Sequence, residues 1–127
     1  MFSDFTHDER ELIVRLPYRV GMWMSQVDSS GGEAANTAER EALETIVMSY
    51  AEDFLKSEFV QRVMEQTLAR RDEWTAWTSH LSQVPDECRR AVAMLGPYLS
   101  SRDVNAFKHN LFDIATAVAV ALRGGEE

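Results

Sequence analysis

The last third of the chain constrains the fold most. From Ile114 to Leu122 the sequence is apolar on nearly every side of a helix, a pattern typical of an element that is buried on several sides. A membrane span would need about 20 apolar residues, and Lys108 and Asp113 interrupt any such window. We therefore expect a central core helix in this segment and no membrane span.

The same helical period recurs along the rest of the chain, and capping residues mark several helix starts. Thr6 and Glu9 form a capping box at the start of the first helix, because each side chain can bond the backbone amide of the other residue. Within that helix Pro17 predicts a kink or a break, since proline lacks an amide hydrogen. Ser57 is a further candidate cap, and Ser100 or Ser101 is the candidate cap of the last helix.

No segment shows the alternation of apolar and polar residues that strands require. Pro85 suits the first turn of a helix, and Gly96 with Pro97 suits the end of the same helix. The sequence thus predicts an all-α fold, a single all-helical domain over residues 1–127. We expect a bundle of six or seven helices with a buried C-terminal helix.

Charge and cysteine content limit the partners and the compartment. The chain carries 13 basic and 21 acidic residues, a net charge of -8, which disfavours nucleic-acid phosphates as ligands. We expect a protein partner or self-association instead. The single cysteine, Cys88, allows no internal disulfide and suits a reducing compartment. The N-terminus resembles no secretory signal, so the expected location is cytoplasmic.

The motifs of common enzyme classes do not occur. The sequence has no Gly-x-Ser-x-Gly elbow, phosphate-binding loop or dinucleotide turn. A di-iron bundle needs Glu-x-x-His on two helices, and none of His7, His80 and His109 has a glutamate three residues earlier. Cys88 near a helix start is best interpreted as a small helix residue. We expect a protein that is not an enzyme and needs no cofactor.

One acidic turn is a candidate site. Asp28 to Glu39 has the twelve-residue span of an EF-hand loop, with Ser30 at the third position. The sixth position, where that loop needs glycine, is Glu33, so a regular EF-hand is not expected. Asp28, Glu39 and Glu41 remain candidate oxygen ligands for a divalent cation. The alternative stays open, because acids in a first helical turn also complement the helix dipole.

The same turn resembles the TerB-like (tellurite-resistance) helical domain, whose typical form is Ala-Asp-Gly-x-Ile/Leu-Ser-x-x-Glu. Asp28 matches the aspartate, Gly31 or Gly32 the glycine, and Glu39 or Glu41 the helix-start glutamate. The apolar residues that follow are also similar: Ala42, Leu43, Ile46 and Val47. The resemblance implies a helical bundle with pseudo-twofold character and no established catalytic residues. It also implies a role in stress response, metal sensing or scaffolding.

Two functional hypotheses follow. The first is a non-enzymatic interaction or stress-sensing module of TerB-like type, with a weak divalent-cation site at the acidic turn. The alternative is a structural or regulatory protein without metal. That protein would form a homodimer through an apolar face containing Trp74 or Trp77, of which at least one is expected to be partly exposed.

Overall fold

The computed structural model describes residues 4–27, 41, 43–45, 48 and 57–124. Every regular element within these residues is helical, which confirms the all-α fold. The elements in chain order are α1 (His7–Val27), α3 (Glu58–Ala69), the 3-10 helices η2 (Arg71–Thr78) and η3 (Leu81–Gln83), α4 (Val84–Leu95) and α5 (Ser101–Gly124).

The capping residues identified in the sequence begin the helices as expected. The Thr6 amide donates to Glu9 Oε1 at 2.8 Å, and the Glu9 amide donates to Thr6 Oγ1 at 3.2 Å, so the capping box is formed. Ser57 and Ser100 each accept a bond from the backbone amide three residues later, at 3.4 and 3.2 Å. Pro85 lies in the first turn of α4.

Pro17 does not break the first helix. It lies inside α1, which continues through it to Val27. Proline removes one backbone hydrogen bond, but the neighbouring side chains of Leu16 and Tyr18 are almost fully buried, at 0 and 1 % exposure. Burial of side chains this large contributes about 1.5–3 kcal/mol each, which offsets the lost bond and keeps the chain helical.

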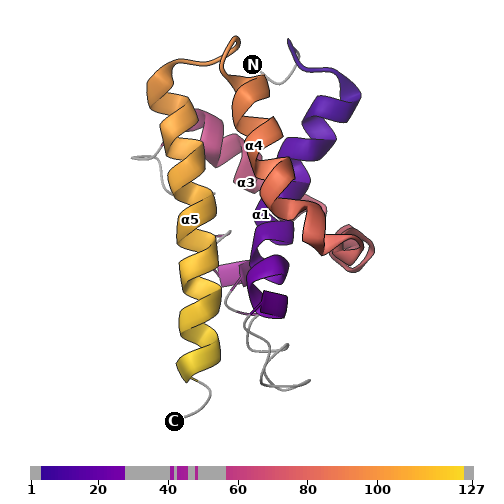
Figure 1. Ribbon diagram of the computed structural model, residues 1–127. Helices are drawn as coiled ribbons and strands as arrows, with labels where there is room; N and C mark the ends of the chain where they lie inside the picture. The colour runs from indigo at the N-terminus through magenta and orange to yellow at the C-terminus, as the bar shows by residue number, and fades with distance from the viewer. Residues whose placement is uncertain (1–3, 28–40, 42, 46–47, 49–56, 125–127) are drawn as a thin grey trace.

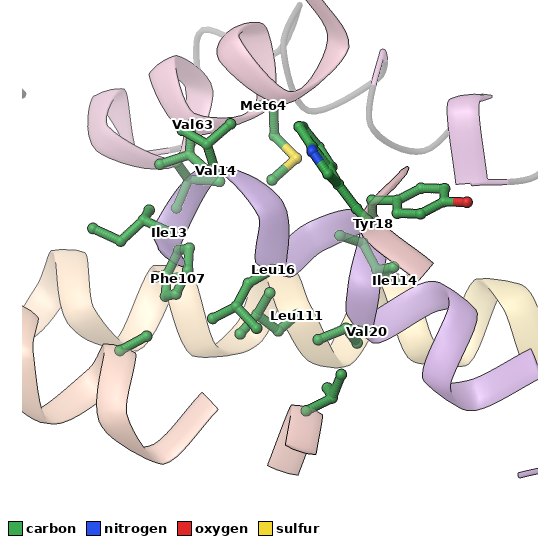
Figure 2. Packing of buried hydrophobic residues seen from close by; sticks show 14 of the residues in the cluster. Ile13, Val14, Leu16, Tyr18, Val20, Val63, Met64, Phe107, Leu111 and Ile114 are labelled. Carbon is green, nitrogen blue, oxygen red and sulfur yellow. The ribbon is translucent and has the colours of Figure 1, made fainter. Parts of the chain in front are cut away.

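The centre of the bundle is α1. This helix contacts α3, α4, α5 and both 3-10 helices. Figure 2 shows Val63 and Met64 of α3 on one side of α1, and Phe107 and Leu111 of α5 on the other side. Side chains of α1 such as Ile13 fill the space between them.

Over residues 101–120, the C-terminal helix is buried on one face only. Phe107 and Ile114 on its inner face are fully buried, whereas Phe112 and Val120 on its outer face are 68 % and 62 % exposed. Figure 1 shows α5 along one side of the molecule. The expectation that this helix is central was therefore wrong, because α1 occupies that position. Among the described helices, α5 included, none combines the length and apolarity of a membrane span.

Candidate binding cleft

A cleft of about 320 Å³ lies between α1 and α4, beside the end of η2. One stripe of α1, one stripe of α4 and the residues that follow η2 line it. Its charged lining residues are Asp8, Glu11, Arg15, Arg19, Glu87 and Arg90. This volume is at the small end of the range for ligand pockets, and the charges decide what the cleft can hold.

Arg19 at the inner end of the cleft is buried and fully hydrogen-bonded. Its Nε and Nη2 atoms donate to the two carboxylate oxygens of Glu87 at 2.8 and 3.2 Å. Its Nη1 atom donates to the carbonyls of Trp77 and Ser79, both at 2.7 Å, and Nη2 also donates to the His80 carbonyl at 3.1 Å. Arg19 therefore fastens the end of η2 and the start of α4 to α1, and has no donor nitrogen left for a ligand.

His80 makes this convergence of carbonyls possible. Its φ of 57° is in the left-handed region, which is uncommon for a residue other than glycine but is adopted more often by histidine than by most residues. The His80 carbonyl accepts from Arg19 and also from the Gln83 amide at 3.0 Å. The turn at His80 thus lets the chain leave η2, present its carbonyls to Arg19 and enter α4.

Arg15, which also lines the cleft, differs from Arg19 because it is partly exposed and has unused donors. Its side chain is 43 % exposed and donates one bond among the described residues, from Nη2 to Glu11 Oε1 at 2.8 Å. Its Nε atom is buried and has no acceptor within the described part of the chain. Its guanidinium carbon lies 5.7 Å from the centre of the Trp77 ring. A guanidinium has five N–H donors, so Arg15 retains N–H groups that can donate hydrogen bonds to an anion.

Glu11 is neutralised by a second arginine. Arg70 binds both Glu11 oxygens, at 2.5 and 2.9 Å, and lies 5.2 Å from the Trp77 ring centre. The hydrogen bonds from Arg70, opposed by burial and assisted by Arg15, lower the pKa of Glu11 to about 2. Glu11 is therefore a charged acceptor at neutral pH, and its charge is compensated inside the protein.

Helices α1 and α4 run antiparallel, which sets the residues that face each other across the cleft. Arg19 contacts Glu87, and the ring of Phe5, before α1, lies 4.9 Å from that of Tyr98, after α4. Arg90 is three residues beyond Glu87, so it lies level with the position three residues before Arg19. That position is adjacent to Arg15. From this helix geometry we infer that the two arginines, which both line the cleft, lie on opposite walls at a similar level.

The charged lining residues differ in how far they are paired. Glu87 is paired with Arg19, and Glu11 with both Arg70 and Arg15. Arg70 is shared with Glu73, so this network is neutral as a whole. Within the described part of the chain, Arg90 and Asp8 line the cleft without an ion pair. The cleft therefore offers an anion the charge of Arg90 and the remaining donors of Arg15.

The cation ligands proposed from the sequence are not tested by this arrangement. Asp28 and Glu39 lie outside the described residues, and Glu41 is an exposed helical residue. No group of three or more metal-binding side chains occurs among the residues that the structure describes. Burial, assisted by Glu87, raises the pKa of the Cys88 thiol to about 11. Cys88 is therefore a poor nucleophile at neutral pH, in keeping with its interpretation as a small helix residue.

The cleft was not predicted from the sequence, and the predicted exposure of a tryptophan was wrong. Trp74 and Trp77 are 5 % and 3 % exposed, so the expectation of a partly exposed tryptophan was wrong. Trp74 donates its indole N–H to the Thr67 carbonyl at 2.9 Å. One available signal was Arg19, the single charged residue in the run 16–24, since a charge within an apolar run is buried only where it is paired.

The fold and the cleft define a class: a helical bundle with an arginine-lined groove between two antiparallel helices. Comparisons with protein-family models, with curated proteins and with solved structures find no match to this chain. The resemblance to the TerB-like family therefore stays a prediction, based on the motif residues around Asp28.

Proposed function

We propose that this chain is a non-enzymatic helical interaction module that binds an anionic group of a protein partner in the cleft between α1 and α4. The observation that carries this proposal is that Arg15 of α1 and Arg90 of α4 line the same cleft. An anion between two guanidinium groups offsets their mutual repulsion. Hydrogen bonds from arginine to carboxylate are charge-assisted and can be bidentate, so a carboxylate suits this position.

Glu11 in the cleft and Cys88 beside it support binding rather than catalysis. A general acid or base works best with a pKa near the operating pH. The pKa of Glu11 is held at about 2 and that of Cys88 at about 11, so neither group exchanges a proton readily at neutral pH. Glu11 keeps a fixed negative charge there, and Cys88 stays a neutral thiol.

The test is a titration with a blocked tetrapeptide that contains one aspartate, followed through the arginine Nε–Hε resonances. We expect a saturable shift of the Arg15 resonance. Arg15→Gln and Arg90→Gln should each weaken binding about tenfold, because a hydrogen bond to a charged group contributes about 1.5–3 kcal/mol. The stress-sensing role and the cytoplasmic location remain proposals from the sequence, which this titration does not address.

Arg89→Gln is the matched control for Arg90→Gln. Arg89 is the preceding residue on α4, is 74 % exposed, does not line the cleft, and lies 3.6 Å from Asp86. Arg89→Gln removes one positive charge from the same helix as Arg90→Gln. It therefore measures how far the change in net charge alone weakens peptide binding. Equal losses for Arg89→Gln and Arg90→Gln, or no binding at millimolar peptide, would overturn the proposal.

A second candidate function, self-association, is favoured by the outer face of α5. Because Trp74 and Trp77 are buried, an apolar contact between two copies would instead involve Phe112 and Val120, which are 68 % and 62 % exposed. Phe112→Ser should then lower the molecular mass measured by sedimentation from dimer to monomer. A wild-type monomer at high concentration would exclude this candidate.

A further inference from the structure

We infer that the ligand of the cleft is a peptide segment in the polyproline II conformation with an acidic residue and, three residues away, a basic residue. This inference rests on the proposed function, because it assumes that the acidic side chain lies between Arg15 and Arg90. It adds a second contact at Asp8, which also lines the cleft.

The spacing along α1 gives the spacing in the ligand. Asp8 and Arg15 are seven residues apart and line the same cleft, so they lie two turns apart on one stripe of the helix. With a rise of about 1.5 Å per residue, this separation is about 10 Å. A polyproline II chain has three residues per turn and advances about 3.1 Å per residue. Three residues of such a ligand therefore span about 9 Å, close to the distance from the arginines to Asp8, and both charged side chains lie on the same face.

The surface between the two ends is suited to small, uncharged ligand residues. Leu12 lies between Asp8 and Arg15 on α1, is partly buried, and lines the cleft. Glu11, at the same level, is compensated by Arg70 and Arg15. The buried Trp77 also lines this part of the cleft. A volume of about 320 Å³ accommodates a short single segment of a partner rather than a folded helix.

Asp8 has no ion pair within the described part of the chain, and it is exposed. Its position in the first turn of α1 also complements the helix dipole. That effect changes the stability of the protein, whereas a ligand contact changes which peptide the protein prefers. Peptide preference therefore separates the two roles of this carboxylate.

The experiment compares three blocked hexapeptides that share aspartate at position two and differ at position five, which is lysine, leucine or glutamate. Isothermal titration should give wild-type affinities in the order lysine, leucine, glutamate. We expect steps of about two- to fivefold, the effect of an exposed ion pair. Asp8→Lys should reverse the order. Asp86→Lys changes the net charge equally on an exposed site outside the cleft and should keep the wild-type order.

The outcomes distinguish this inference from the proposed function. If the peptides bind, depend on Arg90 and are not discriminated at position five, the inference about the basic residue fails and anion binding stands. The same holds if Asp8→Lys and Asp86→Lys alter the order equally. If none of the three peptides binds, or binding is independent of Arg15 and Arg90, the proposed function itself fails. Thermal unfolding of each variant checks that the bundle is folded.

Discussion

The Arg19 guanidinium and the Glu87 carboxylate join α1 to α4 by two hydrogen bonds of 2.8 and 3.2 Å. Both side chains are largely shielded from water, with side-chain exposures of 10 % and 15 %. Since Arg19 also satisfies three backbone carbonyls, it supports the wall of the cleft without contacting the ligand. The cleft depends on this contact, because the same contact holds α4 against α1.

Replacing this arginine should destabilise the protein strongly. Arg19→Met leaves the Glu87 carboxylate and three carbonyls without their donor. Breaking a buried ion pair by removing one partner costs about 3–5 kcal/mol, which we expect as the loss in the free energy of unfolding measured with urea. Arg62→Met is the control, because Arg62 pairs with Glu58 at 3.8 Å on the surface. It should change stability by less than about 0.5 kcal/mol; equal losses would contradict the structural role of Arg19.

Stability should fall in acid because of Glu11. Its pKa in the folded protein is lowered from 4.5 to about 2, so its contribution is complete above pH 4.5 and is lost as the pH falls toward 2. At about 1.36 kcal/mol per pKa unit the upper limit is roughly 3 kcal/mol, and solvent screening reduces it to about 1–2 kcal/mol. The wild type should exceed Glu11→Gln by this amount at pH 6. The two should converge near pH 2, and a constant difference would contradict the assignment.

Gly21 on α1 is required for the approach of Leu43. A methyl group at Gly21 would lie 2.9 and 3.0 Å from the two Cδ atoms of Leu43, which is 1 % exposed and cannot move aside freely. Overpacking costs about 1–3 kcal/mol, more than the gain of about 1 kcal/mol from alanine in a helix. Gly21→Ala should therefore lower the melting temperature. In a Leu43→Ala background the same change should raise it, and an unchanged sign would refute the contact.

Asn110 on the inner face of α5 is fully buried, and neither its Oδ1 nor its Nδ2 has a hydrogen-bond partner among the residues that the structure describes. A buried amide without partners costs about 1–3 kcal/mol. Asn110→Leu should therefore raise the free energy of unfolding by about 1 kcal/mol. Asn105→Leu, at an exposed position of the same helix, is the control and should leave stability unchanged. A destabilised Asn110→Leu would show that the amide has a role in the folded state.

The acidic turn predicts stabilisation by a divalent cation. For a dissociation constant near 1 mM, 10 mM calcium or magnesium should add about 1.4 kcal/mol to the free energy of unfolding. Replacing Asp28, Glu39 and Glu41 by their amides should abolish this effect. A melting temperature that does not respond to the cation in the wild type would rule out the site.

The fold class could be predicted from the sequence because capping and helical period are local properties. Thr6, Ser57, Ser100 and Pro85 begin helices as expected. The identity of the central helix could not be predicted. The charged residues of α1 suggest a helix with one side in solvent. Arg19, however, is buried, and the residues that it bonds are 58 to 68 positions later in the sequence.

The cleft could not be predicted from the sequence for the same reason. Tertiary contacts decide which of its charged groups are paired. Arg19 uses all its donors on Glu87 and three carbonyls, and Glu11 accepts hydrogen bonds from Arg70. Arg90 lines the cleft without an ion pair among the described residues, and Arg15 keeps donors beyond its bond to Glu11. The sequence gives no indication of which arginine has donors left. Arg15 and Arg90 are also 75 positions apart, so nothing local indicates that they line the same cleft.

The bonds from Arg19 to backbone oxygens also determine which changes the turn after η2 can tolerate. Every residue type has a carbonyl, so Ser79 can be exchanged for another polar residue without removing the atom that Arg19 binds. An inserted or deleted residue between Trp77 and His80 would move the carbonyls out of reach. We therefore expect homologous chains that keep the bonds from Arg19 to these carbonyls to vary in the composition of the turn but to keep its length.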